Sequence, residues 1–252
     1  HKVYHNSVNL YGAYTGTANS SLLSAAFVIT GTGLTGCDVR NNAFVNTITG
    51  GTTSIAHVSI SLPSGGTSAM NLTLNNNGYY SGSTAGAAGI CFVGTTYSVA
   101  NLYLAANFDN TVITPSTNLR AYTSTLSAGG QNDNASFAST LPAPYTSNSN
   151  LHIPFATTSK LESGGASVGI TTDIDGDTRP GPTGSVNGGA TAPDIGYDEF
   201  DGIPGSAVPD PNNVGTTAIS SSQGTLYLCP PYLPTNLTVT VKNFGTATQN
   251  II

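Results

Sequence analysis

Charged side chains are scarce in this sequence. They make up 7% of its 252 residues, against roughly 25% in an average soluble domain. Such scarcity is found in membrane proteins, disordered tracts and repetitive folds. No apolar run approaches the roughly 20 residues that a membrane helix needs. Disordered tracts have few aromatic residues, whereas this chain has 12 Tyr and 8 Phe. We therefore expect an all-β fold whose surface consists of Ser, Thr, Asn and Gly.

Basic residues and cysteines are also few. Six Lys and Arg stand against 12 Asp and Glu, which gives a net charge of −6. A protein that binds nucleic acid needs a basic stripe to displace counterions, so we expect no nucleic-acid partner. The cysteines, Cys37, Cys91 and Cys229, are odd in number and far apart, unlike a disulfide framework or a metal motif. We expect buried thiols or at most one bridge.

Similar segments recur about every 35 residues. VYHNSVNL, VRNNAFVN and LTLNNNGYY each place β-forming residues around an asparagine, and Asn6, Asn42 and Asn77 superpose at spacings of 36 and 35 residues. Short strands at this period predict the coils of a parallel β-helix, in which equivalent residues stack about 4.8 Å apart. Stacked asparagines then form a hydrogen-bonded ladder, whereas a charge would meet its own copy in every coil. The alternative is an antiparallel sandwich with Asn-rich turns.

Beyond residue 80 the repeat fades. The pattern predicts a helix over 98–109 and strands over 116–124 and 149–155. Residues 202–213 contain three prolines without periodicity, which indicates a linker. Residues 214–252 alternate apolar and polar side chains, as at the start of an immunoglobulin-like β-sandwich module. Both ends fall within strand-like sequence, so we expect a segment of a longer polypeptide.

Seven of the 12 acidic residues lie between 173 and 201. One interpretation is a structural clasp, in which Arg179 forks onto Asp194, Asp198 or Glu199. The alternative is a calcium site built from Asp173, Asp175 and Asp177, because Ca²⁺ takes six to eight oxygen ligands. The spacing is not that of an EF-hand, since a glycine separates the second and third aspartates. The irregular region beyond residue 80 and the acidic stretch both follow the repeats, so we also expect them to cap the end of the β-helix.

The sequence offers little for catalysis. Glycoside hydrolysis needs two facing carboxylates, and residues 1–150 contain only Asp38, Asp109 and Asp133. Strand alternation puts Asp38 and Arg40 on one face, where a weak surface ion pair is the ordinary outcome. The histidines have no Ser or Cys partner in a recognisable motif; they are His1, His5, His57 and His152. We therefore expect no enzyme activity.

Tyrosines supply the candidate ligand surface. Tyr79, Tyr80 and Tyr97 are candidates for stacking on sugars, because a tyrosine combines an apolar face with a polar tip. This observation supports a second hypothesis, in which the protein binds or cleaves a polysaccharide.

The segments VYHNSVNLYG, SAAFVITGTG and CDVRNNAFVN, with the closing DIDGDTRPG and APDIGYDEF, are familiar together. They resemble the large secreted right-handed parallel β-helix proteins, pectate-lyase-like in fold, of Bacteroidetes and Chlorobi-type bacteria. The family's closing pattern is close to D-x-D-G-x-x-R, then P-D-I-G-A-x-E, and Tyr197 stands here in place of its alanine. The resemblance covers about residues 1–201.

The resemblance implies an exported protein of the bacterial cell surface. Such proteins are followed by immunoglobulin-like modules and a C-terminal sorting signal, as in type IX secretion. Most have no assigned activity, and a minority of relatives are polysaccharide lyases or glycosidases. We expect a non-enzymatic structural or adhesive role, with surface proteins or glycans as partners and calcium as the one candidate cofactor. The alternatives are a polysaccharide-binding or polysaccharide-cleaving protein, and a subunit of an extracellular filament or surface complex.

Overall fold

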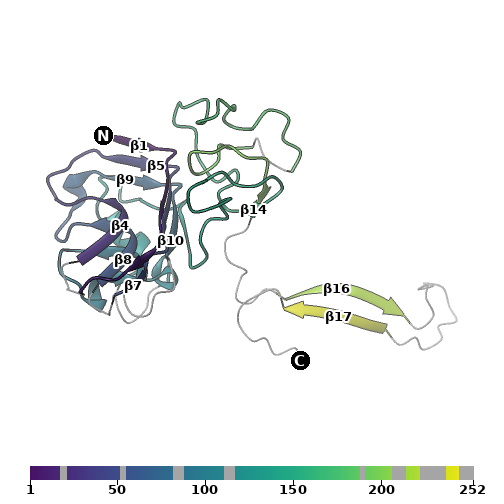
Figure 1. The fold of residues 1–252 in the computed structure, drawn as a ribbon, viewed down its shortest axis with the longest axis horizontal. Coiled ribbons are helices and arrows are strands. Elements are labelled where there is room, and N and C mark those ends of the chain that lie inside the picture. Colours follow the sequence, from purple (N-terminus) through teal and green to yellow (C-terminus); the bar gives the residue numbers. More distant parts are fainter. Residues whose placement is uncertain are drawn as a thin grey trace. The chain divides into compact units, whose positions relative to one another are not determined.

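The computed structural model divides into two units, residues 1–207 and 208–252, and its ribbon is drawn in Figure 1. It describes residues 1–17, 22–51, 55–81, 88–110, 117–187, 191–205, 214–221 and 237–243. Strands predominate, and helices are short. Among the described residues, no helix has the length and apolar character to cross a membrane.

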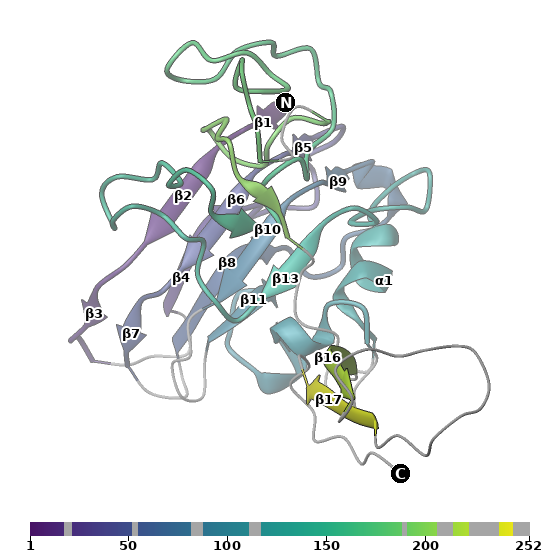
Figure 2. The ribbon, with the colours of Figure 1, turned by 90° about the vertical axis from the view of Figure 1, so that its right-hand side faces the viewer.

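Parallel strands build the first unit. The first sheet holds β1 (Lys2–Tyr4), β5 (Asp38–Arg40) and β9 (Thr73–Asn75). The second holds β2 (Ser7–Leu10), β6 (Ala43–Asn46), β10 (Gly78–Ser81) and β13 (Phe137–Ser139). The third holds β4 (Leu22–Val28), β8 (Ile55–Leu62) and β11 (Ala88–Val93), with β12 (Leu102–Tyr103) antiparallel at its edge. Figure 2 shows β2, β6, β10 and β13 side by side.

The chain visits the three sheets in the same order three times. We call each passage a coil: β1, β2 and β4 form the first, β5, β6 and β8 the second, and β9, β10 and β11 the third. The register is regular, since Val8 pairs with Phe44 and Phe44 with Tyr79. Two further short pairs are parallel, β3 (Ala13–Tyr14) with β7 (Thr49–Gly50), and β14 (Thr158–Ser159) with β15 (Ile203–Pro204).

The core lies between the three sheets. It contains a row of three aromatic rings. Phe44 and Tyr79 are in register on neighbouring strands of the second sheet, so their rings point the same way and stack, with centroids 6.3 Å apart. Phe27, from the third sheet, stacks on Phe44 across the core at 5.2 Å. Cys37 and Cys91 are buried free thiols within this core, and Cys229 lies outside the described residues.

Three predicted elements are wrong. Residues 116–124, predicted as a strand, contain the helix α1 (Leu119–Ser124), which begins where Asn118 Oδ1 accepts the N–H of Ala121. The predicted helix over 98–109 is instead two 3₁₀ turns, Val99–Asn101 and Ala105–Asn107, with β12 between them. Residues 149–155 form no strand. Local sequence favoured the wrong element in each case, and long-range packing decided the outcome.

The far end of the coils is covered by residues 102–139 and not by the acidic stretch. Strand β13 pairs with β10, β12 with β11, and the peptides of Leu126 and Asp133 bond to Leu72 and Leu74 beside β9. The predicted cap is therefore confirmed for the irregular region and wrong for the acidic stretch.

The second unit contains β16 (Val214–Ser221) and β17 (Leu237–Asn243), paired antiparallel with an irregularity between Thr216 and Ala218. The predicted linker spans the boundary between the units. Its residues 206–213 lie outside the described residues, as do 222–236 and 244–252 of the predicted sandwich module. The immunoglobulin-like module therefore stays a prediction.

Candidate functional site

The predicted asparagine ladder is present. Asn6 donates from its side-chain nitrogen and its backbone N–H to Oδ1 of Asn42, over 2.8 and 3.0 Å. Asn42 makes the same two bonds to Oδ1 of Asn77, both at 3.0 Å. The remaining donor of Asn42 reaches the carbonyl oxygens of Val3 and Arg40. Asn42 and Asn77 are fully buried, and their amides satisfy the backbone where each chain turns between two sheets.

A second column stands one residue before the ladder. His5, Asn41 and Asn76 all have positive φ, at 52°, 61° and 52°, and this backbone region is one that asparagine tolerates better than most residues. Their side chains leave the coils and meet a later part of the chain. Asn41 exchanges two hydrogen bonds with the backbone of Ala166, and Asn76 donates to the carbonyl oxygen of Gly164.

The closing segment, residues 193–201, lies along the coils. The N–H of Gly196 donates to the carbonyl oxygen of Asn41, and that of Tyr197 to the hydroxyl of Ser7. The closing segment is also bonded to residues 161–165 through Ile195 N–H to Leu161 and Gly165 N–H to Pro193. Behind these bonds an apolar layer fills the outer face of the second sheet; it includes Ala43, Val45, Tyr80, Phe137, Leu161, Ile195 and Phe200.

Arg179 is the centre of the predicted clasp. Its side chain is 1% exposed, and its guanidinium donates to the carbonyl oxygens of Tyr197 and Gly196, over 2.7 and 3.2 Å. It forms an ion pair with Glu199 at 3.4 Å. Asp194 meets it only through the backbone carbonyl, at 3.5 Å. Of the three predicted acidic partners, Glu199 alone therefore pairs with Arg179 through its carboxylate among the described residues.

The other carboxylates of the clasp accept backbone N–H groups. Asp194 accepts from Ser163 and Phe200, and Asp198 from Ile153. Glu199 accepts a short hydrogen bond from the N–H of Asp194. These bonds favour the ionised carboxylates, and they fix the turn of the closing segment.

Burial shifts the protonation of the same groups. Burial, together with the charge of Glu199, raises the pKa of Asp194 to about 9. Burial raises the pKa of Glu199 to about 7, against the opposing effects of the Asp194 N–H and of Arg179. Burial also raises the pKa of Asp198. The clasp therefore holds protons more tightly than exposed carboxylates do.

The predicted calcium trio is not gathered into one site. Both carboxylate oxygens of Asp173 are occupied, because Oδ1 accepts from the backbone N–H of Asp175 and Asp177, and Oδ2 from that of Glu199. Asp173 thus joins the D-x-D-G turn to the closing segment. Among the described residues, the acidic stretch places Asp175 instead with His152 and Asp198, in one group of ligand-type atoms within 4.8 Å of one another.

Two of the predicted sugar-stacking residues are wrong. Tyr79 is fully buried in the core and Tyr80 is 5% exposed beneath the closing segment. Strand β10 has protein on both faces, so neither ring is available to a ligand. The hydroxyl of Tyr79 donates instead to Asp133, over 2.8 Å.

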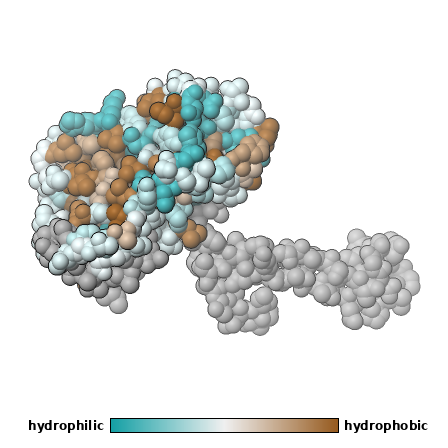
Figure 3. Space-filling model, in the orientation of Figure 1, coloured by the Kyte–Doolittle hydropathy of each residue, from teal (hydrophilic) through white to brown (hydrophobic). Residues whose placement is uncertain are grey.

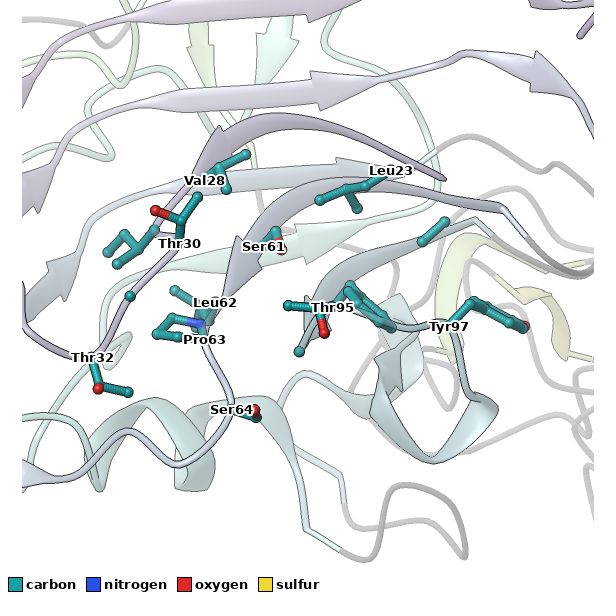
Figure 4. A pocket seen from close by; sticks show the side chains of 15 residues that line it. Leu23, Val28, Thr30, Thr32, Ser61, Leu62, Pro63, Ser64, Thr95 and Tyr97 are labelled. Atoms are coloured by element: carbon teal, nitrogen blue, oxygen red, sulfur yellow. The ribbon is translucent and has the colours of Figure 1, made fainter. Parts of the chain in front are cut away.

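Tyr97 lines a groove of about 460 Å³ over the third sheet. Its ring stacks on Phe92, with centroids 6.5 Å apart. Figure 4 shows Leu23 and Val28 along one side and Thr95 and Tyr97 along the other. Leu23 and Val28 are 39% and 42% exposed. Hydrophobic residues also gather over the region of β4 and β8 in Figure 3. The groove also contains hydroxyl side chains from Thr30, Thr32, Ser61, Ser64 and Thr95.

Asp38 and Arg40 form the predicted ion pair, at 2.7 Å. The hydroxyl of Tyr4, one coil away, donates to Asp38, and Arg40 lies over its ring, 5.3 Å from the centroid. Burial opposes the effect, but the hydrogen bonds from Arg40 and Tyr4 hold the pKa of Asp38 below its usual value. This carboxylate is an ordinary surface anion and not a general acid.

Sequence reasoning missed one serine–histidine pair. Ser24 Oγ and His57 Nδ1 are 2.7 Å apart, on neighbouring strands in register. Nε2 of His57 faces the carbonyl oxygen of Gly50 at 3.3 Å, and the imidazole is 2% exposed. A nucleophilic serine needs an accessible hydroxyl and a base oriented by an acid. The pair therefore serves packing between coils, and only the strand register reveals it.

No family model, no curated protein and no solved structure matches the chain.

Proposed function

We propose that residues 1–201 contain a right-handed parallel β-helix with its closing motif, and that this part of the chain serves as a non-catalytic, stiff structural or adhesive element on the outside of a bacterial cell. The regular register of three parallel sheets, visited in a fixed order, supports the solenoid. The resemblance of the closing motif to secreted β-helix proteins supports the location.

The main support for a non-catalytic role is that the acidic side chains of the clasp are engaged in hydrogen bonds and an ion pair within the protein. Asp173, Asp194 and Asp198 accept backbone N–H groups, and Glu199 also pairs with Arg179. Catalytic carboxylates must instead face a substrate and a water molecule. The residues that carry most of the charge are thus committed to holding the closing segment against the coils.

An activity assay tests this proposal. The chain is incubated with acidic and neutral polysaccharides, and new reducing ends and unsaturated products are measured. We expect no turnover above a heat-denatured control. Turnover that is lost in Asp38→Asn or in His57→Gln would overturn the proposal, because Asp38 or His57 would then be catalytic and not structural. Electron microscopy of native material should show stiff rods on the cell surface.

Carbohydrate binding without cleavage is a second candidate, favoured by the groove at Tyr97. An aromatic ring beside several hydroxyl side chains is a usual surface for a sugar ring. A glycan array identifies the sugar. Binding without turnover would make the protein an adhesin, whereas the absence of any retained glycan would leave the mechanical role alone.

A further inference from the structure

Three side chains from separate parts of the chain meet beside the clasp. His152 follows the turn at 147–150, Asp175 belongs to the D-x-D-G turn, and Asp198 belongs to the closing segment. Nε2 of His152 and Oδ2 of Asp175 are 2.7 Å apart. One ligand-type atom of each of the three residues lies within 4.8 Å of the other two. We propose that His152, Asp175 and Asp198 form a binding site for a divalent transition metal of the zinc class.

The buried carboxylate of Asp198 is the second observation that points to a cation. Asp198 is 8% exposed, and among the described residues its carboxylate has one hydrogen bond, from the N–H of Ile153 to Oδ2. A buried carboxylate ordinarily has several hydrogen bonds or a cationic partner. The guanidinium of Arg179 is taken up by Glu199 and by carbonyl oxygens. Asp198 is therefore held in place through Oδ2, and its second oxygen has no protein hydrogen bond among the described residues and is open to a cation.

The donor set selects the class of metal. One imidazole nitrogen and two carboxylate oxygens suit zinc, whereas calcium takes oxygen ligands only. Tetrahedral zinc, with bonds of about 2.0–2.2 Å, holds its ligand atoms about 3.3 Å apart. The atoms already lie within 4.8 Å. Asp175 is exposed and the side chain of His152 is 42% exposed, so both have room to adjust.

Neighbouring groups orient the ligands. The hydroxyl of Tyr197 and Oδ1 of Asn150 lie 2.9 and 2.5 Å from Nδ1 of His152, which leaves Nε2 for the metal. The N–H of Asp175 is bonded to Asp173. Such outer contacts fix the ring and raise the affinity of a metal site. The bound ion would cross-link three segments that the clasp brings together, and this inference does not depend on the proposed function.

The experiment is a calorimetric titration of the EDTA-treated full chain with ZnCl₂. We expect one Zn²⁺ per chain, reversed by EDTA, with binding weakened at least about tenfold in His152→Gln and in Asp198→Asn. Asp177→Asn, in the same exposed turn, and His1→Ala, at the amino terminus, should bind as the parent does. Co²⁺ should give the visible absorption bands of a low-coordinate nitrogen–oxygen site, and these should be absent in His152→Gln.

Three results would overturn the proposal. They are no saturable binding of Zn²⁺, undiminished binding in both ligand variants, and binding of Ca²⁺ alone with dependence on Asp173 or Asp177. The rival interpretation is a plain hydrogen-bonded contact of His152 with Asp175 and Asn150, and the first result would favour it. Should Asp198→Asn fail to fold, His152→Gln decides alone, because its side chain is partly exposed; circular dichroism without metal checks its fold.

Discussion

The side chain of Asn42 donates a hydrogen bond to Oδ1 of Asn77, 35 residues later, over 3.0 Å. The same oxygen accepts the backbone N–H of Asn42. One amide thereby fixes the register between two coils, because a shift by a single residue would break both bonds and turn every side chain of the strand to the other face.

Removal of the central ladder side chain should destabilise the first unit. Asn42→Ala leaves the carbonyl oxygens of Val3 and Arg40 and the donors of Asn6 without their partner. We expect a loss of about 2–4 kcal/mol in the free energy of unfolding, since a buried unsatisfied group costs about 1–3 kcal/mol. Urea denaturation measures it. Asn134→Ala, at an exposed asparagine, is the matched control and should change stability by less than about 0.5 kcal/mol.

Arg179→Ala should cost more than the loss of any exposed cation. The substitution removes the cationic partner of the buried Glu199 carboxylate, which keeps only the N–H of Asp194, and the donor to the carbonyl oxygens of Gly196 and Tyr197. Breaking a buried ion pair costs about 3–5 kcal/mol. Thermal melting and limited proteolysis within 202–213 both report the loosening. Arg40→Ala removes a partly exposed pair and should cost about 1 kcal/mol or less; equal effects of the two would refute a special role for Arg179.

Gly196 should not accept a side chain. Its φ is +111°, and a Cβ there would stand 2.6 Å from the hydroxyl oxygen of Ser7. Gly184 has φ of +91° with open space around it, so Gly184→Ala measures the backbone strain alone, about 1–3 kcal/mol. We expect Gly196→Ala to be the more destabilising of the two in urea denaturation. If both variants unfold at the same urea concentration, the close contact of residue 196 with Ser7 is contradicted.

The pH dependence of stability should identify Glu199. Its pKa is raised to about 7 in the folded chain, so it contributes stability that is full below about pH 4.5 and is lost as the pH rises through 7. Relative to the parent, Glu199→Gln should gain up to about 3 kcal/mol in unfolding free energy between these pH values. Unfolding curves at several pH values measure the difference. A constant difference between parent and variant would show that the carboxyl titrates normally.

The contribution of His5 to stability changes with pH in the opposite direction to that of Glu199, over nearly the same pH range. Burial, with the charge of Arg179, lowers its pKa to about 4, so its contribution is present above pH 6.5 and is lost as the pH falls. The parent alone therefore shows only the net effect of His5, Glu199 and Asp194, whose pKa is also raised. The comparison with Glu199→Gln removes the Glu199 contribution, together with its effect on Asp194, and leaves that of His5.

Any glycan that the array retains should depend on Tyr97. Tyr97→Ala should weaken binding by about two- to tenfold, since an aromatic contact is worth about 0.5–1.5 kcal/mol. Tyr11→Ala removes a tyrosine that is 50% exposed and lies outside the groove lining, and should leave binding unchanged. Surface plasmon resonance on the retained glycan compares the three proteins. Equal affinity in all of them would exclude the groove.

The sequence predicts the parts of the fold that repeat. Asn6, Asn42 and Asn77 recur at a nearly constant spacing, so the stacking of coils and the ladder follow from the pattern. The clasp at Arg179 and Glu199 is also predictable, because one basic residue stands among many acids. Both features can be found from the spacing and the charge of residues in the sequence alone.

Features that depend on distant segments are not predictable in this way. The sequence around Tyr80 suggests a surface residue, but in the structure the closing segment covers its strand. His152 joins the acidic group across 23 residues to Asp175 and 46 to Asp198, and no local pattern marks it. Residues 119–124 suit a strand or a helix equally, and the Asn118 cap with surrounding contacts selects the helix.

The path of the closing segment across the coils has a mechanical consequence. The closing segment is bonded to the first coil at Ser7 and to the second at Asn41, and residues 161–165, to which it is bonded, meet the third coil at Asn76. A force on the closing segment is therefore shared among contacts with all three coils and is not carried by one coil alone.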